Sequence, residues 1–177
     1  MNPSIRKHRY RFAFGIAALV CTGASALHPF GAPKRDTQPL PLLTPWASAE
    51  VSRLFQRSCM DCHSNSTNWP WYSYVAPTSW LVERDVHSGR RHLNLSGWQQ
   101  YTNEQKQKLL ADIASVVKNG EMPLPQYLLI HRQAALSSQE IETLYQWART
   151  ERKKLREIDG STRLPSADAL SGIDSSR

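Results

Sequence analysis

Apolar residues recur at helical spacing in three stretches of this chain, and no stretch alternates as a half-buried β-strand would. The first stretch begins near Ser48. Its apolar stripe occupies positions i, i+3, i+4 and i+8, namely Val51, Leu54, Phe55 and Cys59. We therefore predict a helix that starts near Ser48 and runs directly into the cysteine motif.

The other two stretches each open with a capping box, in which two side chains three residues apart satisfy each other's backbone N–H groups. Thr102 and Gln105 form the first box, and Ser137 and Glu140 form the second. The apolar faces behind them are Leu109, Leu110, Ile113, Val116 and Val117, and Ile141, Leu144, Tyr145, Trp147 and Ala148. Gly120 is a typical stop for the former helix, and a basic stretch from Arg149 to Arg156 ends the latter.

The chain between the first two of these helices is rich in tryptophan and too often interrupted for one long helix. We predict a short helix over about Ser79–His87, with ordered loop around it. The fold class is accordingly all-α, a small helical domain with long ordered loops. A body with so much irregular chain needs something to pack around.

The N-terminus has the composition of an export signal. Basic residues up to Arg11, the apolar run Phe12–Val20 and the motif Ala24-Ser25-Ala26 match a cleavable signal peptide. The apolar run extends to Leu27, and its 16 residues also allow an uncleaved membrane anchor. In either case we expect a periplasmic protein, soluble or anchored to the inner membrane by this segment.

The chain thus divides into four parts. Residues 1–26 are predicted to be a signal peptide or N-terminal membrane anchor, and residues 27–45 a proline-rich linker. Residues 46–156 form the helical domain, and residues 157–177, rich in Ser, Gly and Asp, form a disordered tail.

The net charge of +7 does not indicate a nucleic-acid partner. Four of the 22 basic residues lie in the first eleven positions, and the rest of the chain balances 18 basic residues against 15 acidic ones. A body so close to neutrality gives no electrostatic reason to bind a phosphate backbone.

The stretch Cys59-Met60-Asp61-Cys62-His63 carries the most specific chemistry. C-x-x-C-H is the attachment signature of c-type haem, because two thiols form thioethers with one porphyrin and the histidine offers a nitrogen to the iron. A zinc site would need a second pair of ligands, and a thioredoxin-like dithiol would need a preceding strand. A disulfide here would close too short a loop to stabilise a fold. We favour haem over these three alternatives.

Met122 is the candidate for the other side of the iron. It lies between Gly120 and Pro123, outside any amphipathic stripe, and a thioether on a constrained loop suits the sixth position of haem iron. The main alternative is a methionine that fills a gap in the core. The rival sixth ligands are three histidines, His87, His92 and His131.

Two further groups of residues have two interpretations each. Buried indoles supply apolar area and one N–H donor, so the tryptophans suit either a haem pocket or the plain core. They are Trp69, Trp71, Trp80 and Trp98. Arg90 and Arg91 suit either the haem propionates or a solvated turn after Gly89.

Several separate motifs resemble those of haem proteins. The helix ending in C-x-x-C-H, the G-x-M-P loop and the stretch LSSQEIETLYQWA together resemble a class I cytochrome c. That resemblance implies that the first and last helices cross through aromatic residues, here Phe55 with Tyr145 or Trp147. More closely, CMDCHSNSTNWPWYSYVAPTSWLVERDVHSGRRHLNLSGW and GEMPLPQYLLIH are similar to the bacterial haem-binding domain family of small exported or membrane-anchored mono-haem proteins. Leu124-Pro125 departs from the second proline and aromatic residue expected after Met122-Pro123.

We therefore expect one covalent haem c, bound by Cys59, Cys62, His63 and Met122, with the iron held by His63 and Met122. The expected function is single-electron transfer to and from redox partner proteins rather than catalysis. The alternative is a haem-based sensor or small-ligand binder in which the ligand displaces Met122.

Overall fold

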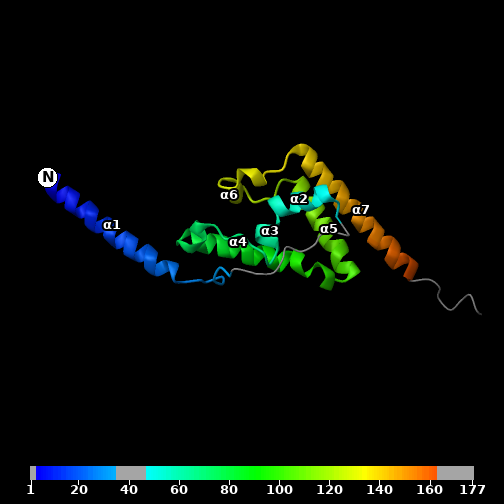
Figure 1. The fold of residues 1–177 in the computed structure, drawn as a ribbon, viewed down its shortest axis with the longest axis horizontal. Helices are drawn as coiled ribbons and strands as arrows, with labels where there is room; N and C mark the ends of the chain where they lie inside the picture. The colour runs from blue at the N-terminus through cyan, green and yellow to red at the C-terminus, as the bar shows by residue number, and fades with distance from the viewer. Residues whose placement is uncertain (1–2, 35–46, 163–177) are drawn as a thin grey trace, which may run out of the picture. The chain divides into compact units, whose positions relative to one another are not determined.

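The computed structural model describes residues 3–34 and 47–162, and every regular element among them is a helix (Figure 1). This confirms the predicted all-α class. Residues 35–45 of the predicted linker and residues 163–177 of the predicted tail lie outside the described residues. Within the described part, no helix is long and apolar enough to cross a membrane.

The described residues fall into two compact units. The first unit contains residues 3–34 and 59–96, with helices α1 (Pro3–Ser25), α3 (Met60–His63), the 3-10 helix η1 (Trp71–Tyr74) and α4 (Thr78–His92). The second contains residues 47–58 and 97–162, with α2 (Ala49–Ser58), α5 (Asn103–Lys118), α6 (Pro125–Leu128), the 3-10 helix η3 (Arg132–Ala134) and α7 (Ser138–Thr162). The 3-10 helix η2 (Leu95–Gln100) spans the boundary between them.

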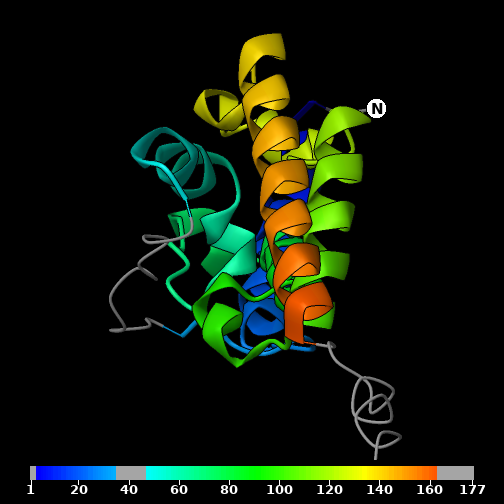
Figure 2. The same cartoon turned by 90° about the vertical axis from the view of Figure 1, so that its right-hand side faces the viewer.

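In the second unit, α5 and α7 pack side by side and antiparallel (Figure 2). Asn103 and Gln107 at the start of α5 bond to Asp159 near the end of α7, at 2.8 and 2.6 Å. At the other end, Lys118 lies 2.8 Å from Glu142. The buried side chains of the two helices lie on the predicted apolar faces and include Leu110, Ile113, Val117, Leu144 and Ala148.

Both predicted capping boxes are present in the second unit. Thr102 and Gln105 bond reciprocally at the start of α5, and Ser137 and Glu140 do the same at the start of α7. The helix α7 continues to Thr162, beyond the boundary predicted at residue 156.

The helix α2 packs against α7 through an aromatic pair. Phe55 and Trp147 meet edge to face, with ring centroids 5.2 Å apart, and Phe55 is 1 % exposed. Of the two predicted partners of Phe55, Trp147 therefore makes the contact. Tyr145 instead lies between Lys118 and Arg149, whose cationic groups are 5.1 and 5.3 Å from the ring centroid.

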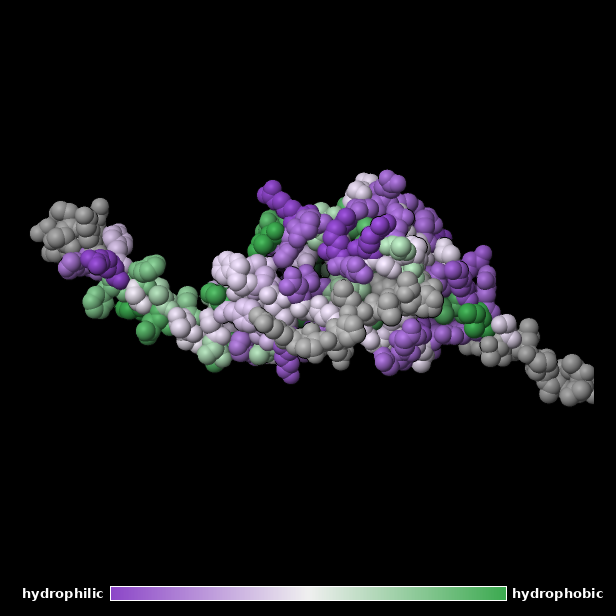
Figure 3. Space-filling view, in the orientation of Figure 1, coloured by the Kyte–Doolittle hydropathy of each residue, from purple (hydrophilic) through white to green (hydrophobic). Residues whose placement is uncertain are grey.

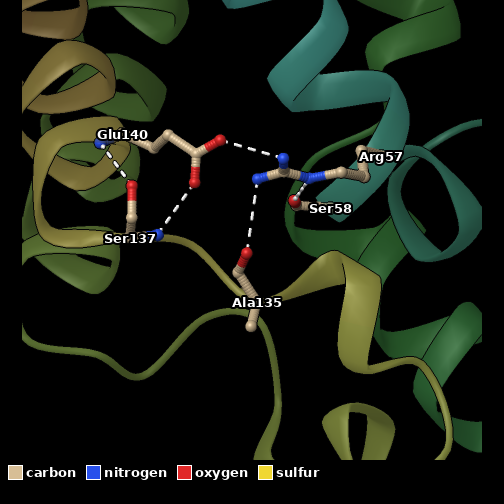
Figure 4. A network of polar contacts seen from close by, with 5 residues as sticks. All are labelled: Arg57, Ser58, Ala135, Ser137 and Glu140. Carbon is tan, nitrogen blue, oxygen red and sulfur yellow. Dashed lines mark hydrogen bonds and ion pairs between the residues drawn. The ribbon is translucent and has the colours of Figure 1, made fainter.

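A polar network adds to this contact (Figure 4). The Arg57 guanidinium at the end of α2 lies 2.9 Å from a carboxylate oxygen of Glu140 and donates to the carbonyl oxygen of Ala135. The other carboxylate oxygen of Glu140 accepts the backbone N–H of Ser137 at 2.8 Å. The end of α2, which leads into the cysteine motif, is thus tied to the start of α7.

In the first unit, the residues after α1 are held against η1 and α4. The indole N–H of Trp80 donates to the carbonyl oxygen of Leu27, and that of Trp69 donates to the carbonyl oxygen of Lys34, both at 2.9 Å. His28 Nδ1 lies 2.6 Å from a carboxylate oxygen of Glu83, which is 1 % exposed. We call residues 27–34 the strap. The strap is the first part of the predicted proline-rich linker, and its backbone carbonyl groups bond to the indoles of this unit.

Candidate haem site

The cysteine motif forms a short helical turn of its own. The helix α2 ends at Ser58, and α3 begins at Met60, so the predicted continuous helix is interrupted at Cys59. The carbonyl oxygen of Cys59 accepts the backbone N–H groups of Cys62 and His63, at 3.2 and 3.0 Å. This turn brings both cysteines and the histidine together at the start of residues 59–96, the second segment of the first unit.

The imidazole of His63 has a defined orientation. Its Nδ1 lies 3.0 Å from the carbonyl oxygen of Leu93, the residue that caps the C-terminal end of α4. Because a carbonyl oxygen only accepts, Nδ1 carries the proton and Nε2 keeps its lone pair. Burial lowers the pKa of His63 and so favours the neutral imidazole. The hydrogen bond to the Leu93 carbonyl oxygen raises this pKa, but by less than burial lowers it. A neutral histidine with one ring nitrogen anchored to the backbone is the usual form of a metal ligand.

The helix α4 approaches the motif closely at Gly89. A Cβ atom on Gly89 would lie 2.7 Å from the carbonyl oxygen of Cys62 and 3.2 Å from its Cβ. Only glycine therefore allows this contact between α4 and α3. The predicted helix Ser79–His87 was too short, since α4 continues through Gly89 to His92.

Arg90 fixes the loop that follows the motif. Its Nε donates to the carbonyl oxygen of Ser64 at 2.8 Å, and its Nη2 donates to the hydroxyl of Thr67 at 2.9 Å. The Thr67 hydroxyl in turn donates to the carbonyl oxygen of Asp61 at 2.6 Å. These bonds give Arg90 a structural role beside the motif, instead of the solvated turn that the sequence also allowed.

The thiol of Cys62 lacks the lowered pKa of a reactive redox cysteine. Neither Cys59 nor Cys62 forms a disulfide bond. Burial raises the pKa of Cys62 to about 12, with further contributions from Asp61 and Asp85 that exceed the opposing effect of Arg90. A reactive dithiol needs the opposite, a thiol whose pKa is lowered toward neutrality. Within the described residues, no group of three or more His, Cys, Asp or Glu side chains is placed to hold a metal ion by itself.

Met122 lies in the second unit, on a loop fixed to the end of α5. Gly120 has a φ of +69°, the left-handed conformation that glycine adopts at low cost. The N–H groups of Gly120 and Glu121 bond to the carbonyl oxygens of Val117 and Val116, which is the Schellman pattern of a helix end. The N–H of Met122 also points to the Val116 carbonyl oxygen, at 3.3 Å. The backbone of the predicted sixth ligand is therefore constrained, and its side chain is half-buried.

Each of the three histidines that could replace Met122 as sixth ligand has local surroundings that account for it without haem. His87 is exposed, His92 bonds through Nδ1 to the carbonyl oxygen of Ser88 on its own helix, and the ring of His131 stacks on that of Tyr127, with centroids 4.3 Å apart.

The tryptophans of the first unit have different surroundings from one another. Trp69 and Trp80 use their N–H groups on the strap, and Trp71 is 77 % exposed.

The groups that position the motif were difficult to recognise from the sequence. Leu93 acts through its carbonyl oxygen, which no side-chain pattern reveals. Gly89 did carry a signal, because a glycine inside a helical stretch costs stability and can have a packing reason. The sequence also allowed a solvated turn of Arg90 and Arg91 after Gly89.

The donor set of the first unit fits a c-type haem: two thiols that form no disulfide and an oriented neutral imidazole lie in one turn. The family model described as Haem-binding domain matches residues 24–150. The chain belongs to this haem-binding domain family. The match includes the strap as well as α2 to α6 and the first half of α7. As a member of the family, the chain binds haem. No curated protein and no solved structure gives a significant match to the chain.

Proposed function

We propose that the chain is a c-type cytochrome that carries one haem covalently on Cys59 and Cys62 and transfers single electrons outside the cytoplasmic membrane. The observation that carries this proposal is the His63–Leu93 hydrogen bond, because it prepares Nε2 of His63 as an axial ligand in the same turn as the two thiols. The haem, when bound, supplies the one-electron chemistry. The residues of the chain hold it and fix its proximal ligand.

Met122 is proposed as the sixth ligand. Support comes from its chemistry and from the Schellman end of α5, which holds the Met122 backbone without occupying its sulfur. Met/His ligation raises the reduction potential, which suits a carrier that exchanges electrons with redox partner proteins. The proposal is for a carrier rather than an enzyme, located in the periplasm, either soluble or held by the N-terminal segment.

The first experiment asks whether haem is covalently bound. The chain is expressed behind a functioning export signal in a host that attaches haem c, and haem that stays on the denatured polypeptide is measured. Wild type is expected to keep one haem, and Cys59→Ser/Cys62→Ser is expected to lose it on denaturation. A wild-type chain that releases all its haem when denatured would contradict the covalent attachment while leaving haem binding intact.

The second experiment identifies the sixth ligand. Visible spectra and reduction potentials of wild type, Met122→Ala and the control Met60→Leu are compared. Loss of an iron–thioether charge-transfer band and a lower potential in Met122→Ala alone are expected. An unchanged low-spin spectrum in Met122→Ala would indicate a histidine instead. Binding of carbon monoxide by the reduced wild-type protein would favour the alternative function, a haem-based sensor or small-ligand binder.

A further inference from the structure

The 3-10 helix η1 has two chemically different faces. Trp71 and Tyr74 are three residues apart, and side chains at this spacing eclipse in a 3-10 helix. They are 77 % and 43 % exposed, and the next residue, Val75, is 45 % exposed. We call Trp71, Tyr74 and Val75 the η1 face. It is an exposed apolar and aromatic surface of the first unit.

The other side of η1 is turned toward the cysteine motif. Ser73 is fully buried, and the pKa of Tyr72 is raised by burial and by the nearby Asp61 and Cys62. Ser73 therefore points into the unit, while the ring of Trp71 packs edge to face on that of Tyr72, with centroids 5.8 Å apart. The exposed η1 face could serve either as a wall of the haem pocket or as a docking surface, and the test below separates the two.

The η1 face is connected directly to the end of α1. The backbone N–H of Ala76, just after η1, donates to the hydroxyl of Ser25, the last residue of α1, at 2.9 Å. The Trp80–Leu27 bond follows two residues later along the N-terminal segment. With these two bonds in place, no flexible spacer separates α1 from η1. The end of α1 therefore lies beside the residues that follow η1.

The surface that α1 offers is apolar. Its exposed large side chains include Phe12, Phe14, Ile16, Leu19 and Val20. Figure 3 shows a hydrophobic stretch along α1. Arg9 and Arg11 precede these apolar residues in the helix. Exposed apolar side chains with basic residues at one end match the chemistry of a bilayer with anionic head groups.

We propose that the η1 face contacts the head-group region of a lipid bilayer engaged by α1. Trp and Tyr favour this region, because their rings combine an apolar body with a polar N–H or O–H group. The first unit, which carries the cysteine motif, is then held at the membrane surface with η1 toward the lipid. This inference does not depend on which residues ligate the iron.

The test uses the full chain, α1 included, and vesicles made of equal parts phosphatidylcholine and phosphatidylglycerol. Partitioning is measured by co-flotation for wild type and for Trp71→Ser/Tyr74→Ser. Removing two aromatic side chains from the interface is expected to weaken partitioning about tenfold. The aromatic variant Trp71→Phe/Tyr74→Phe is expected to bind nearly as well as wild type.

Leu129→Ser/Ile130→Ser is the matched control. These two residues are 76 % and 60 % exposed and are not part of the proposed contact, so their replacement is expected to leave partitioning unchanged. Equal partitioning of wild type and Trp71→Ser/Tyr74→Ser would overturn the proposal, and so would equal losses in both serine pairs. An altered haem spectrum in Trp71→Ser/Tyr74→Ser would assign the η1 face to the haem site, and altered sedimentation without vesicles would assign it to a second copy of the chain. Haem content, measured on the same samples, reports separately on the proposed cytochrome function.

Discussion

His63 Nδ1 and the carbonyl oxygen of Leu93 are 3.0 Å apart, and this bond makes the end of α4 the support for the imidazole. The Leu93 N–H itself bonds to the carbonyl oxygen of Gly89 at 2.9 Å, and Gly89 is the residue that meets the backbone of Cys62. The same two turns of α4 therefore position both the second cysteine and the histidine. The proposed haem site depends on α4 as much as on the motif itself.

Leu93→Ala tests the role of this support. The Leu93 side chain is 8 % exposed, so its truncation is expected to cost about 2–4 kcal/mol of unfolding free energy and to loosen the position of its carbonyl oxygen. We expect a shifted reduction potential in the haem-loaded variant. Leu95→Ala is the control, because Leu95 is 1 % exposed and its carbonyl oxygen does not bond to His63. Similar losses of stability with a changed potential only in Leu93→Ala would support the orienting role. Identical potentials would contradict it.

Gly89→Ala is expected to damage the site through steric overlap. The new Cβ would lie 2.7 Å from the carbonyl oxygen of Cys62, and since both groups are backbone-attached, either α3 or α4 must shift. Such overpacking costs about 1–3 kcal/mol, and we expect less covalently attached haem per polypeptide. Gly160→Ala is the control, because a Cβ there meets nothing within 4 Å. It should keep full haem attachment. Equal haem content in the two variants would show that the close approach is not required.

The helices of the second unit were predictable because local chemistry determines them. The two capping boxes and the glycine after α5 fix helix ends with groups only a few residues apart. The apolar stripe of α2 likewise predicted a buried Phe55.

The candidate site was predicted from the spacing of its residues and from ligand chemistry. Its four cofactor-binding residues are Cys59, Cys62, His63 and Met122.

The first unit was less predictable, because tertiary contacts determine its structure. Trp80 and Trp69 satisfy their N–H groups on strap residues 53 and 35 positions away, which no local pattern indicates. Gly89 lowers helix propensity, yet α4 continues through it because the packing against Cys62 requires a residue without a Cβ. The helix end at Leu93 and its bond to His63 follow from that packing.

His28→Ala is expected to destabilise the first unit by leaving a buried carboxylate without its partner. The Glu83 side chain is 0 % exposed, and its Oε1 atom lies 2.6 Å from His28 Nδ1. Removing one partner of a fully buried ion pair costs roughly 3 kcal/mol of unfolding free energy. We expect a smaller loss here, because the His28 side chain is 29 % exposed. Unfolding is measured by denaturant titration. The double variant His28→Ala/Glu83→Gln removes the charge and should recover part of the loss. A double variant no more stable than His28→Ala would show that the unpaired charge is not the cause.

The ion pair between Arg57 and Glu140 is expected to make stability depend on pH in the acid range. The pKa of Glu140 is lowered to about 2 from its usual value of 4.5. The largest cause is the hydrogen bond from Arg57, and the second is the hydrogen bond from the backbone N–H of Ser137. The folded state therefore favours the carboxylate. The resulting stability is present above about pH 4.5 and is lost as the pH falls toward about 2. In Arg57→Ala this part of the pH dependence should become shallower.

A double-mutant cycle with Arg57→Ala and Glu140→Gln measures the pair, because glutamine keeps the capping box at the start of α7. Both side chains are partly exposed, 36 % and 26 %, so we expect a coupling free energy of about 1 kcal/mol at neutral pH. The pair Lys153–Glu157, 3.9 Å apart and far more exposed, is the control, with an expected coupling of about 0.3 kcal/mol. The coupling between Arg57 and Glu140 should also vanish near pH 2, where the carboxylate becomes protonated. A coupling that persists there unchanged would mean that the contact does not depend on the charge of Glu140.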